Sequence, residues 1–278
     1  MIECLLFNPQ RRIILSMKRI LYTYCMYTQV YAPHFPLVLL PFFLQDSIKF
    51  SPTFSASKKM EFKLITEERF DDVIKHLRHS FFSDEPLNKA AGLCRNGSGN
   101  RELEHHSYET LQDNLSLMAV NTHDEIAGVI LNGVLHPGDV ECSQKKLELI
   151  DDDNFKKIFQ LLYSHNLKSN IFEKFHVDKA FDVRILSVDS RFRGQGVAKQ
   201  LVGRCEPLAK KCKFGTAFFS QLMKADATGI FSQKILKSNG FQLLSEQYYS
   251  KYTDEFNKPV LNVEAPHIKL QLLYKILN

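Results

Sequence analysis

The sequence has few cysteines and no pattern that would join them. Six occur in 278 residues, without a Cys-x-x-Cys pair or the ligand spacing of a zinc finger. A secreted framework of disulfides is not expected in so long a chain. The cysteines are expected to be reduced thiols, some of them buried, in a cytoplasmic protein.

The main part of the chain also lacks an excess of positive charge. Residues 1–59 contain seven Lys/Arg and two Asp/Glu, which accounts for the whole formal net charge of +5. Residues 60–278 are therefore formally neutral. Since nucleic-acid binding normally needs a basic face, no nucleic-acid partner is expected.

Several catalytic and binding motifs are absent. No His-Glu-x-x-His sequence occurs, and the histidines, including the neighbouring His105 and His106, have no carboxylates at ligand spacing. No Gly-Lys-Ser/Thr sequence of a Walker loop is present either. No metal is expected, and the histidines are interpreted as surface or structural residues.

Residues 1–59 differ in composition from the rest of the chain. The uncharged stretch from Ile20 to Leu44 is long enough on paper to cross a bilayer, but Pro33, Pro36 and Pro41 would interrupt a spanning helix. Three interpretations remain: a membrane signal, an unstructured extension, and a start assigned too early. The third is favoured because Met60 directly precedes the first segment with a regular pattern, so association with a membrane is not expected. The expected division is an extension over 1–59 and one domain over 60–278.

From Met60 onward the hydrophobic pattern alternates between the periods of strands and helices, which is typical of a mixed α/β domain. Strands are predicted at 62–65, 116–121, 126–135, 181–188, 216–220, 241–249 and 268–276. Helices are predicted from Thr66 along the stripe Phe70, Val73, Ile74 and Leu77, near 84–86, and over 142–168, 196–212 and 227–238.

The most informative segment joins the predicted strand at 181–188 to the predicted helix at 196–212. Its loop contains Gly194 and Gly196, which let a backbone approach a ligand closely, and exposed N–H groups at the helix start favour a phosphate. A tight turn without a ligand is the plainer interpretation. A dinucleotide fingerprint would need a third glycine where Lys199 stands. What fits is Arg-x-x-Gly-x-Gly/Ala, found at Arg191 to Gly196 and again two residues later, a pattern typical of coenzyme A binding in GNAT enzymes.

Three segments in the same order resemble the insect arylalkylamine N-acetyltransferases, including the dopamine-acetylating enzymes. They are Phe82-Ser-Asp-Glu-Pro-Leu-Asn88, the stretch 185–198, and the stretch 225–241. The resemblance covers about residues 63–274. It implies the GNAT fold, a mixed and mostly antiparallel central sheet flanked by helices. It also implies transfer of an acetyl group from acetyl-CoA to the primary amine of dopamine, serotonin or tryptamine. We expect a monomer.

The resemblance also implies roles for individual residues. Glu85 matches the general base of the family, whereas the plainer interpretation is a helix cap ahead of Pro86; we expect catalysis from Glu85 and capping from Asp84. Ser232 and Thr228 match positions where the dopamine enzymes have catalytic serines, although Thr228 could also cap or line its helix. Phe231 stands where many GNAT enzymes have a proton-donating tyrosine, which leaves the donor to the thiolate open.

The remaining implied contacts are with coenzyme A. The main chain of Leu186, Ser187 and Val188 is expected to pair with the pantetheine arm and to polarise the thioester. The phosphate loop is expected to comprise Arg191, Arg193, Gly194, Gln195, Gly196, Val197 and Ala198. Pro207 within the same predicted helix is expected to kink it. Two alternatives stay open: a GNAT enzyme for a polyamine or another biogenic amine, and a catalytically silent coenzyme A-binding protein.

Overall fold

The computed structural model describes residues 60–95, 97–211 and 221–277, and these form seven strands and eight α-helices with three short 3-10 turns. The strands are β1 (Glu61–Leu64), β2 (Leu117–Val120), β3 (Ile126–Leu135), β4 (Ala180–Val188), β5 (Gln221–Ala227), β6 (Gln242–Tyr248) and β7 (Lys269–Leu277). The helices are α2 (Phe70–Ser80), α3 (Pro86–Ala91), α4 (Arg101–Leu111), α5 (Asp139–Leu147), α6 (Asp153–Ser169), α7 (Ile171–Phe175), α8 (Val197–Lys211) and α9 (Ile230–Ser238). The 3-10 turns are η2 (Glu67–Arg69), η3 (Ser190–Phe192) and η4 (Tyr249–Lys251).

The seven strands form one sheet in the order β1-β2-β3-β4-β5-β7-β6. Every neighbouring pair is antiparallel except β4 and β5, which run parallel. The connection between these two strands passes through α8, as a parallel crossover requires. The predicted mixed and mostly antiparallel sheet is therefore confirmed.

The parallel pair separates toward its carboxyl ends. Phe181–Val183 of β4 pair with Met223–Ala225 of β5, and the described register ends there, although β4 continues to Val188 and β5 to Ala227. On its other side β4 stays paired with β3 as far as Val188. Beyond Val183, the backbone groups of β4 that face β5 have no strand partner among the described residues. This part of β4 can therefore receive a ligand.

A β-bulge lies at the start of the separated part. The register between β3 and β4 passes from Leu131–Ile185 to Asn132–Val183, so Arg184 is the extra residue. A bulge reverses which face the following side chains occupy. Accordingly Val183 packs in the core on the α8 face, whereas Ile185 packs in the core on the opposite face.

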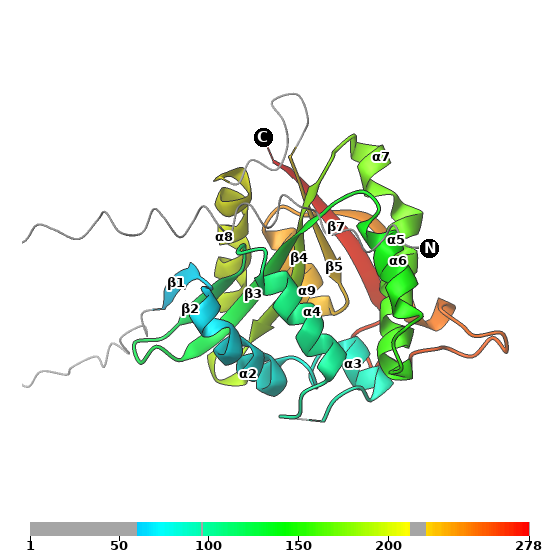
Figure 1. The fold of residues 1–278 in the computed structure, drawn as a ribbon, viewed down its shortest axis with the longest axis horizontal. Coiled ribbons are helices and arrows are strands. Elements are labelled where there is room, and N and C mark those ends of the chain that lie inside the picture. The colour runs from blue at the N-terminus through cyan, green and yellow to red at the C-terminus, as the bar shows by residue number, and fades with distance from the viewer. Residues whose placement is uncertain (1–59, 96, 212–220, 278) are drawn as a thin grey trace, which may run out of the picture. The chain divides into compact units, whose positions relative to one another are not determined.

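Helices cover both faces of the sheet (Figure 1), and the two larger of the three apolar cores among the described residues lie on opposite faces. One contains the buried stripe of α2 together with side chains of α3, α4 and α6, and the other contains the inner faces of α8 and α9. The predicted stripe of α2 is confirmed, since Val73, Ile74 and Leu77 are all buried. The predicted helix at 196–212 corresponds to α8, which continues through Pro207 as far as Lys211.

The predicted helix over 142–168 is wrong as one element. The chain leaves α5 after Leu147 and starts α6 at Asp153, with Asp152 as N-cap accepting hydrogen bonds from the N–H groups of Asn154 and Phe155. A run of three aspartates favours such a start, because a short carboxylate satisfies the free N–H groups of a first turn. The helix α4 was not predicted, and the strand predicted at 216–220 lies outside the described residues. The division at residue 60 stays a prediction.

Gly128 on β3 lies where the end of β4 and the first residue of α8 approach each other closely. A Cβ atom at this position would lie 2.9 Å from the carbonyl oxygen of Ser187 and 3.2 Å from Cγ1 of Val197. Both distances are shorter than an ordinary van der Waals contact. The glycine therefore leaves room for the end of β4 and the start of α8 on the same side.

Candidate active site

Glu85 lies at the N-terminus of α3 and is its N-cap. Its Oε2 accepts a hydrogen bond of 2.7 Å from the N–H of Asn88, and Pro86 occupies the first helical position. The expectation that Asp84 is the cap is wrong. Asp84 forms an ion pair with Arg193 instead, because the extended backbone at Glu85 turns that side chain, rather than its predecessor's, back over the first turn.

The second carboxylate oxygen of Glu85 is available for a proton. Oε1 is buried and makes no hydrogen bond of regular geometry. Burial raises the pKa of the Glu85 carboxyl, while the side chain of Thr228 and the N–H groups of Asn88 and Leu87 oppose that shift. A carboxylate with a raised pKa and a free oxygen is suited to act as a general base near neutral pH.

Thr228 and Tyr249 complete the surroundings of this carboxylate. Thr228 follows the end of β5, and its carbonyl oxygen accepts a hydrogen bond of 2.6 Å from the hydroxyl of Tyr249. Burial and the charge of Glu85 raise the pKa of Tyr249 well above its usual value, so this phenol stays protonated. Thr228 does not cap α9, because Gly229 holds that position without a side-chain bond.

Ser232 lies in the first turn of α9. Its hydroxyl donates a hydrogen bond of 2.8 Å to the carbonyl of Gly229. Gly229 in turn lies against α3, since a Cβ atom there would be 3.3 Å from Cγ of Pro86. The starts of α3 and α9, with Glu85 and Ser232, are thus brought together from segments far apart in the sequence.

His267, which precedes β7, supports the start of α9. Its Nδ1 accepts a hydrogen bond of 3.2 Å from the N–H of Ile230. The ring also contacts Phe231 edge to face, with the centroids 5.7 Å apart, and Phe231 is 64% exposed. Sequence reasoning missed His267 and Tyr249, because no local motif marks them and only the fold brings them to Glu85 and α9.

The predicted phosphate loop, residues 191–198 and called the glycine loop from here on, has the geometry expected of a phosphate-binding site. Gly194 and Gly196 have φ angles of 75° and 77°, which side chains other than glycine rarely adopt. A Cβ atom at Gly194 would meet nothing within 4 Å, and one at Gly196 would meet only the amide of Gln200, at 4.0 Å. The first N–H groups of α8, from Val197 and Ala198, lack partners within the helix. These residues fit a pyrophosphate group.

The polar side chains of the loop make contacts within the protein. The guanidinium of Arg191 pairs with Asp189, and the amide of Gln195 donates to the carbonyl of Arg191. Arg193 donates to the carbonyl of Val188 at 3.0 Å and to Asp84 at 2.6 Å. One guanidinium therefore joins the end of β4 to the residue next to Glu85.

The end of β4 places the predicted thioester contacts beside this loop. Leu186, Ser187 and Val188 lie in the part of β4 that has separated from β5. The hydroxyl of Ser187 is 3.0 Å from Nε2 of His76 on α2. Burial lowers the pKa of His76 to about 4, so the ring is neutral at pH 7. The side chain of Ser187 is thus turned into the protein. Its main chain faces Val129 of β3, two residues before the hydrogen bond from the N–H of Asp189 to the carbonyl of Ala127, so the groups that face the separated side belong to Leu186 and Val188.

The described residues offer neither a metal site nor a membrane-spanning helix. Among residues 60–95, 97–211 and 221–277 no three His, Cys, Asp or Glu side chains come together as metal ligands. None of the helices described in those ranges combines the length and apolarity of a membrane span.

Several solved structures share the fold of this chain. No family model matches the chain. Among solved structures, the arylalkylamine N-acetyltransferase 2 of Aedes aegypti is 50% identical, with a TM-score of 0.75, covering 79% of this chain and 99% of that one. The mosquito arylalkylamine N-acetyltransferase like 5b and the polyamine N-acetyltransferase of Drosophila melanogaster are 20% and 17% identical, with TM-scores of 0.70 and 0.69. Each covers 79% of this chain and 100% of its own, and at this identity they show the fold alone.

A parallel strand pair that opens around a glycine loop, in a sheet that matches these structures, defines an N-acetyltransferase of the GNAT class. Half of the aligned residues are shared with the first of them over almost its whole length. The chain belongs to the insect arylalkylamine N-acetyltransferases.

Proposed function

We propose that the protein transfers an acetyl group from acetyl-CoA to the primary amine of an arylalkylamine such as dopamine, serotonin or tryptamine. The observation that carries the proposal is the buried Glu85 carboxylate, with its free Oε1 and raised pKa, at the start of α3. The 50% identity to an arylalkylamine N-acetyltransferase supports the choice of acceptor.

The proposed reaction is a direct attack without a covalent enzyme intermediate. An alkylammonium group has a pKa of about 10 by analogy with lysine, so it must lose a proton before it can attack. Glu85 accepts this proton at Oε1, directly or through water. The neutral amine then forms a bond to the thioester carbon, and the bond between that carbon and the coenzyme sulfur breaks.

The chain offers main-chain groups for the other charges of the reaction. Negative charge develops on the thioester oxygen, and N–H groups at the separated end of β4 would stabilise it. The pyrophosphate of acetyl-CoA would lie against Gly194, Gly196 and the start of α8. Phe231 cannot donate a proton to the departing thiolate, which leaves Ser232, water or the product ammonium as the donor.

Two further properties belong to the proposal. We expect a monomeric enzyme in the cytoplasm. Burial raises the pKa of Cys205 to about 12, and partial burial raises that of Cys94 to about 11, so both thiols stay protonated at neutral pH.

A thiol-release assay with acetyl-CoA tests the proposed acceptor. The panel comprises dopamine, serotonin, tryptamine, histamine and spermidine, each at saturating and at limiting concentration. We expect the three arylalkylamines to have the highest kcat/KM. Preference for spermidine would identify a polyamine enzyme, and turnover of none of them with intact coenzyme binding would leave a silent coenzyme A-binding protein.

A further inference from the structure

A buried ion cluster joins β4 to β5 at the point where the two strands separate. Nζ of Lys224 on β5 lies 3.2 Å from Oδ1 of Asp182 on β4 and 2.8 Å from Oδ2 of Asp226. The Lys224 and Asp182 side chains are only 5% and 7% exposed. Asp182 and Lys224 are also directly paired in the strand register, as the middle of the three described pairs.

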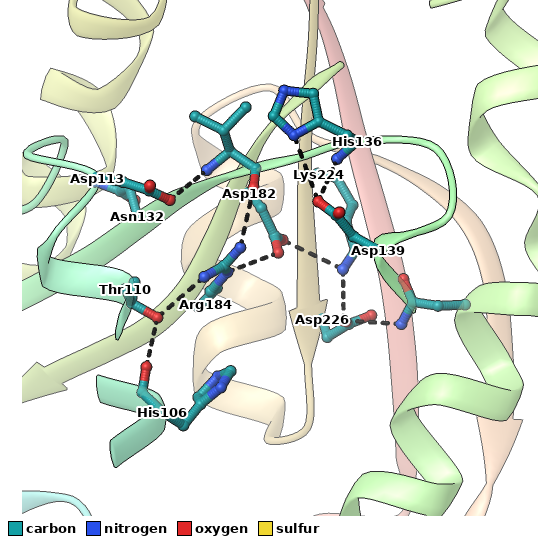
Figure 2. A network of polar contacts seen from close by, with 12 residues as sticks. His106, Thr110, Asp113, Asn132, His136, Asp139, Asp182, Arg184, Lys224 and Asp226 are labelled. Carbon is teal, nitrogen blue, oxygen red and sulfur yellow. Dashed lines mark hydrogen bonds and ion pairs between the residues drawn. The ribbon is translucent and has the colours of Figure 1, made fainter. Parts of the chain in front are cut away.

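Arg184 holds the other side of the same carboxylate. Figure 2 shows its guanidinium and the Lys224 ammonium on opposite sides of Asp182. The guanidinium donates to Oδ2 of Asp182 at 3.1 Å, to the hydroxyl of Thr110 at 3.1 Å and to the carbonyl of Val134 at 3.2 Å. It lies over Gly133, where a Cβ atom would be 2.5 Å from its Cζ. The residue that forms the bulge is therefore held from three sides.

The buried ion cluster consists of Asp182, Arg184, Lys224 and Asp226. Two of these side chains are acidic and two are basic, so their formal charges cancel. Burial alone would raise the pKa of Asp182, but Lys224 and Arg184 outweigh it and lower that pKa. Burial alone would lower the pKa of Lys224, but Asp182 and Asp226 raise it. Both groups of the central pair are thus ionised at neutral pH.

Stability alone does not explain such a cluster. Taking ions out of water costs free energy that their attraction only partly returns, and apolar residues of the same volume would often be as stable. Selection of one register is the better supported use of a buried polar contact. Three residue pairs are a short ladder, and a slip by one residue would turn every side chain of a strand to the other face.

We propose that Lys224 is a positioning residue, whose pairing with Asp182 sets where β4 and β5 part and so holds the main chain of residues 186–188 for the pantetheine arm. Asp226 extends the contact toward the base, because Thr228 follows it by two residues and interacts with Glu85. Lys224 touches neither substrate nor coenzyme in this scheme. The inference rests on the proposed function.

The test compares two ligands by isothermal titration calorimetry. Coenzyme A reaches the separated strands through its pantetheine arm, whereas 3′-phospho-ADP, the same molecule without that arm, reaches only the glycine loop. In Lys224→Met/Asp226→Asn the Asp182–Arg184 pair is kept and one charge of each sign is removed. We expect affinity for coenzyme A to fall at least about tenfold, while that for 3′-phospho-ADP stays within about twofold.

The control is Lys269→Met, which removes an ion pair of 2.8 Å with Glu246 between β7 and β6. It should leave both affinities unchanged. If the double variant does not fold, Asp182→Asn keeps the side-chain shape and should show the same selective loss, at least about threefold.

Three outcomes separate the explanations. An unchanged affinity for coenzyme A in a folded variant overturns the proposal. So does an equal loss for both ligands, which would mark a general structural role. If the unaltered protein binds neither ligand, the proposed function itself fails.

Discussion

Replacing Glu85 by glutamine is the sharpest test of the mechanism, because the structure gives this residue two separate roles. One oxygen caps α3 through the N–H of Asn88, and the other is free for a proton. Glutamine keeps an oxygen for the cap but cannot accept a proton from the amine. We expect turnover at neutral pH to fall by roughly 10²-fold or more, which is typical of a lost acid–base group.

The stability of this variant should change little, and the direction can be worked out. Since burial raises the carboxyl pKa in the folded protein, ionising Glu85 costs free energy of folding as the pH rises through that pKa. Glutamine has no such cost. Glu85→Gln should therefore be no less stable than the unaltered enzyme at pH 7, whereas Glu85→Ala, which loses the cap, should lose about 1 kcal/mol.

The assay is the rate of thiol release as a function of pH, with thermal unfolding measured on the same samples. The variant should regain part of its rate as the pH approaches the pKa of the amine, about 10, because free amine then forms without a base. Asp152→Asn is the matched control, since Asp152 caps α6 in the same manner. Wild-type turnover and an unaltered pH profile for Glu85→Gln would remove Glu85 from the mechanism.

Three other predictions concern the glycine loop, the histidines His76 and His106, and the start of the chain. Gly196→Val should weaken acetyl-CoA binding about tenfold, or 1.4 kcal/mol, because its φ of 77° disfavours a side chain; calorimetry showing unchanged affinity would contradict the loop assignment. Burial lowers the pKa of His76 and His106 to about 4, from 6.5. Between pH 6.5 and 4 the unfolded state binds more protons at these histidines than the folded state does. The free energy of unfolding should therefore be unaffected above pH 6.5 and fall by up to about 3 kcal/mol for each histidine as the pH falls toward 4. Urea unfolding should be less pH-dependent in His76→Gln than in the unaltered protein. A chain that begins at Met60 should have the turnover of the full chain, and its precipitation would show that residues 1–59 are needed.

Most of the strands, the helices α2, α8 and α9, and the glycine loop could be predicted because their signals are local. The strand before Arg191, the glycines and the apolar face of α8 lie within one short segment, and each has its own pattern. The break between α5 and α6 was missed although Asp152 marks it, because the apolar spacing from Leu147 through Ile150 to Phe155 continues across it.

Contacts between distant segments could not be predicted in the same manner. Arg193 and Asp84 are 109 residues apart, and their pairing depends on how the segment before α3 lies beside the loop that follows β4. The neutral His76 beside Ser187 likewise depends on the position of α2. Capping by Glu85 rather than Asp84 is decided by one backbone angle, which two adjacent carboxylates in a sequence do not reveal.

Gly128 has a consequence for how mutational scans of such enzymes are interpreted. It lies on β3, 66 positions before Gly194, and nothing in its own segment suggests a role. Even alanine at this position would press on the carbonyl of Ser187 and on Val197, and so would shift the backbone on which the thioester is expected to rest. In a library selected for activity, Gly128 should therefore behave like an active-site residue without touching any substrate. A map of tolerated substitutions, taken alone, would assign part of the active site to β3, whereas the predicted thioester contacts lie on the neighbouring strand β4.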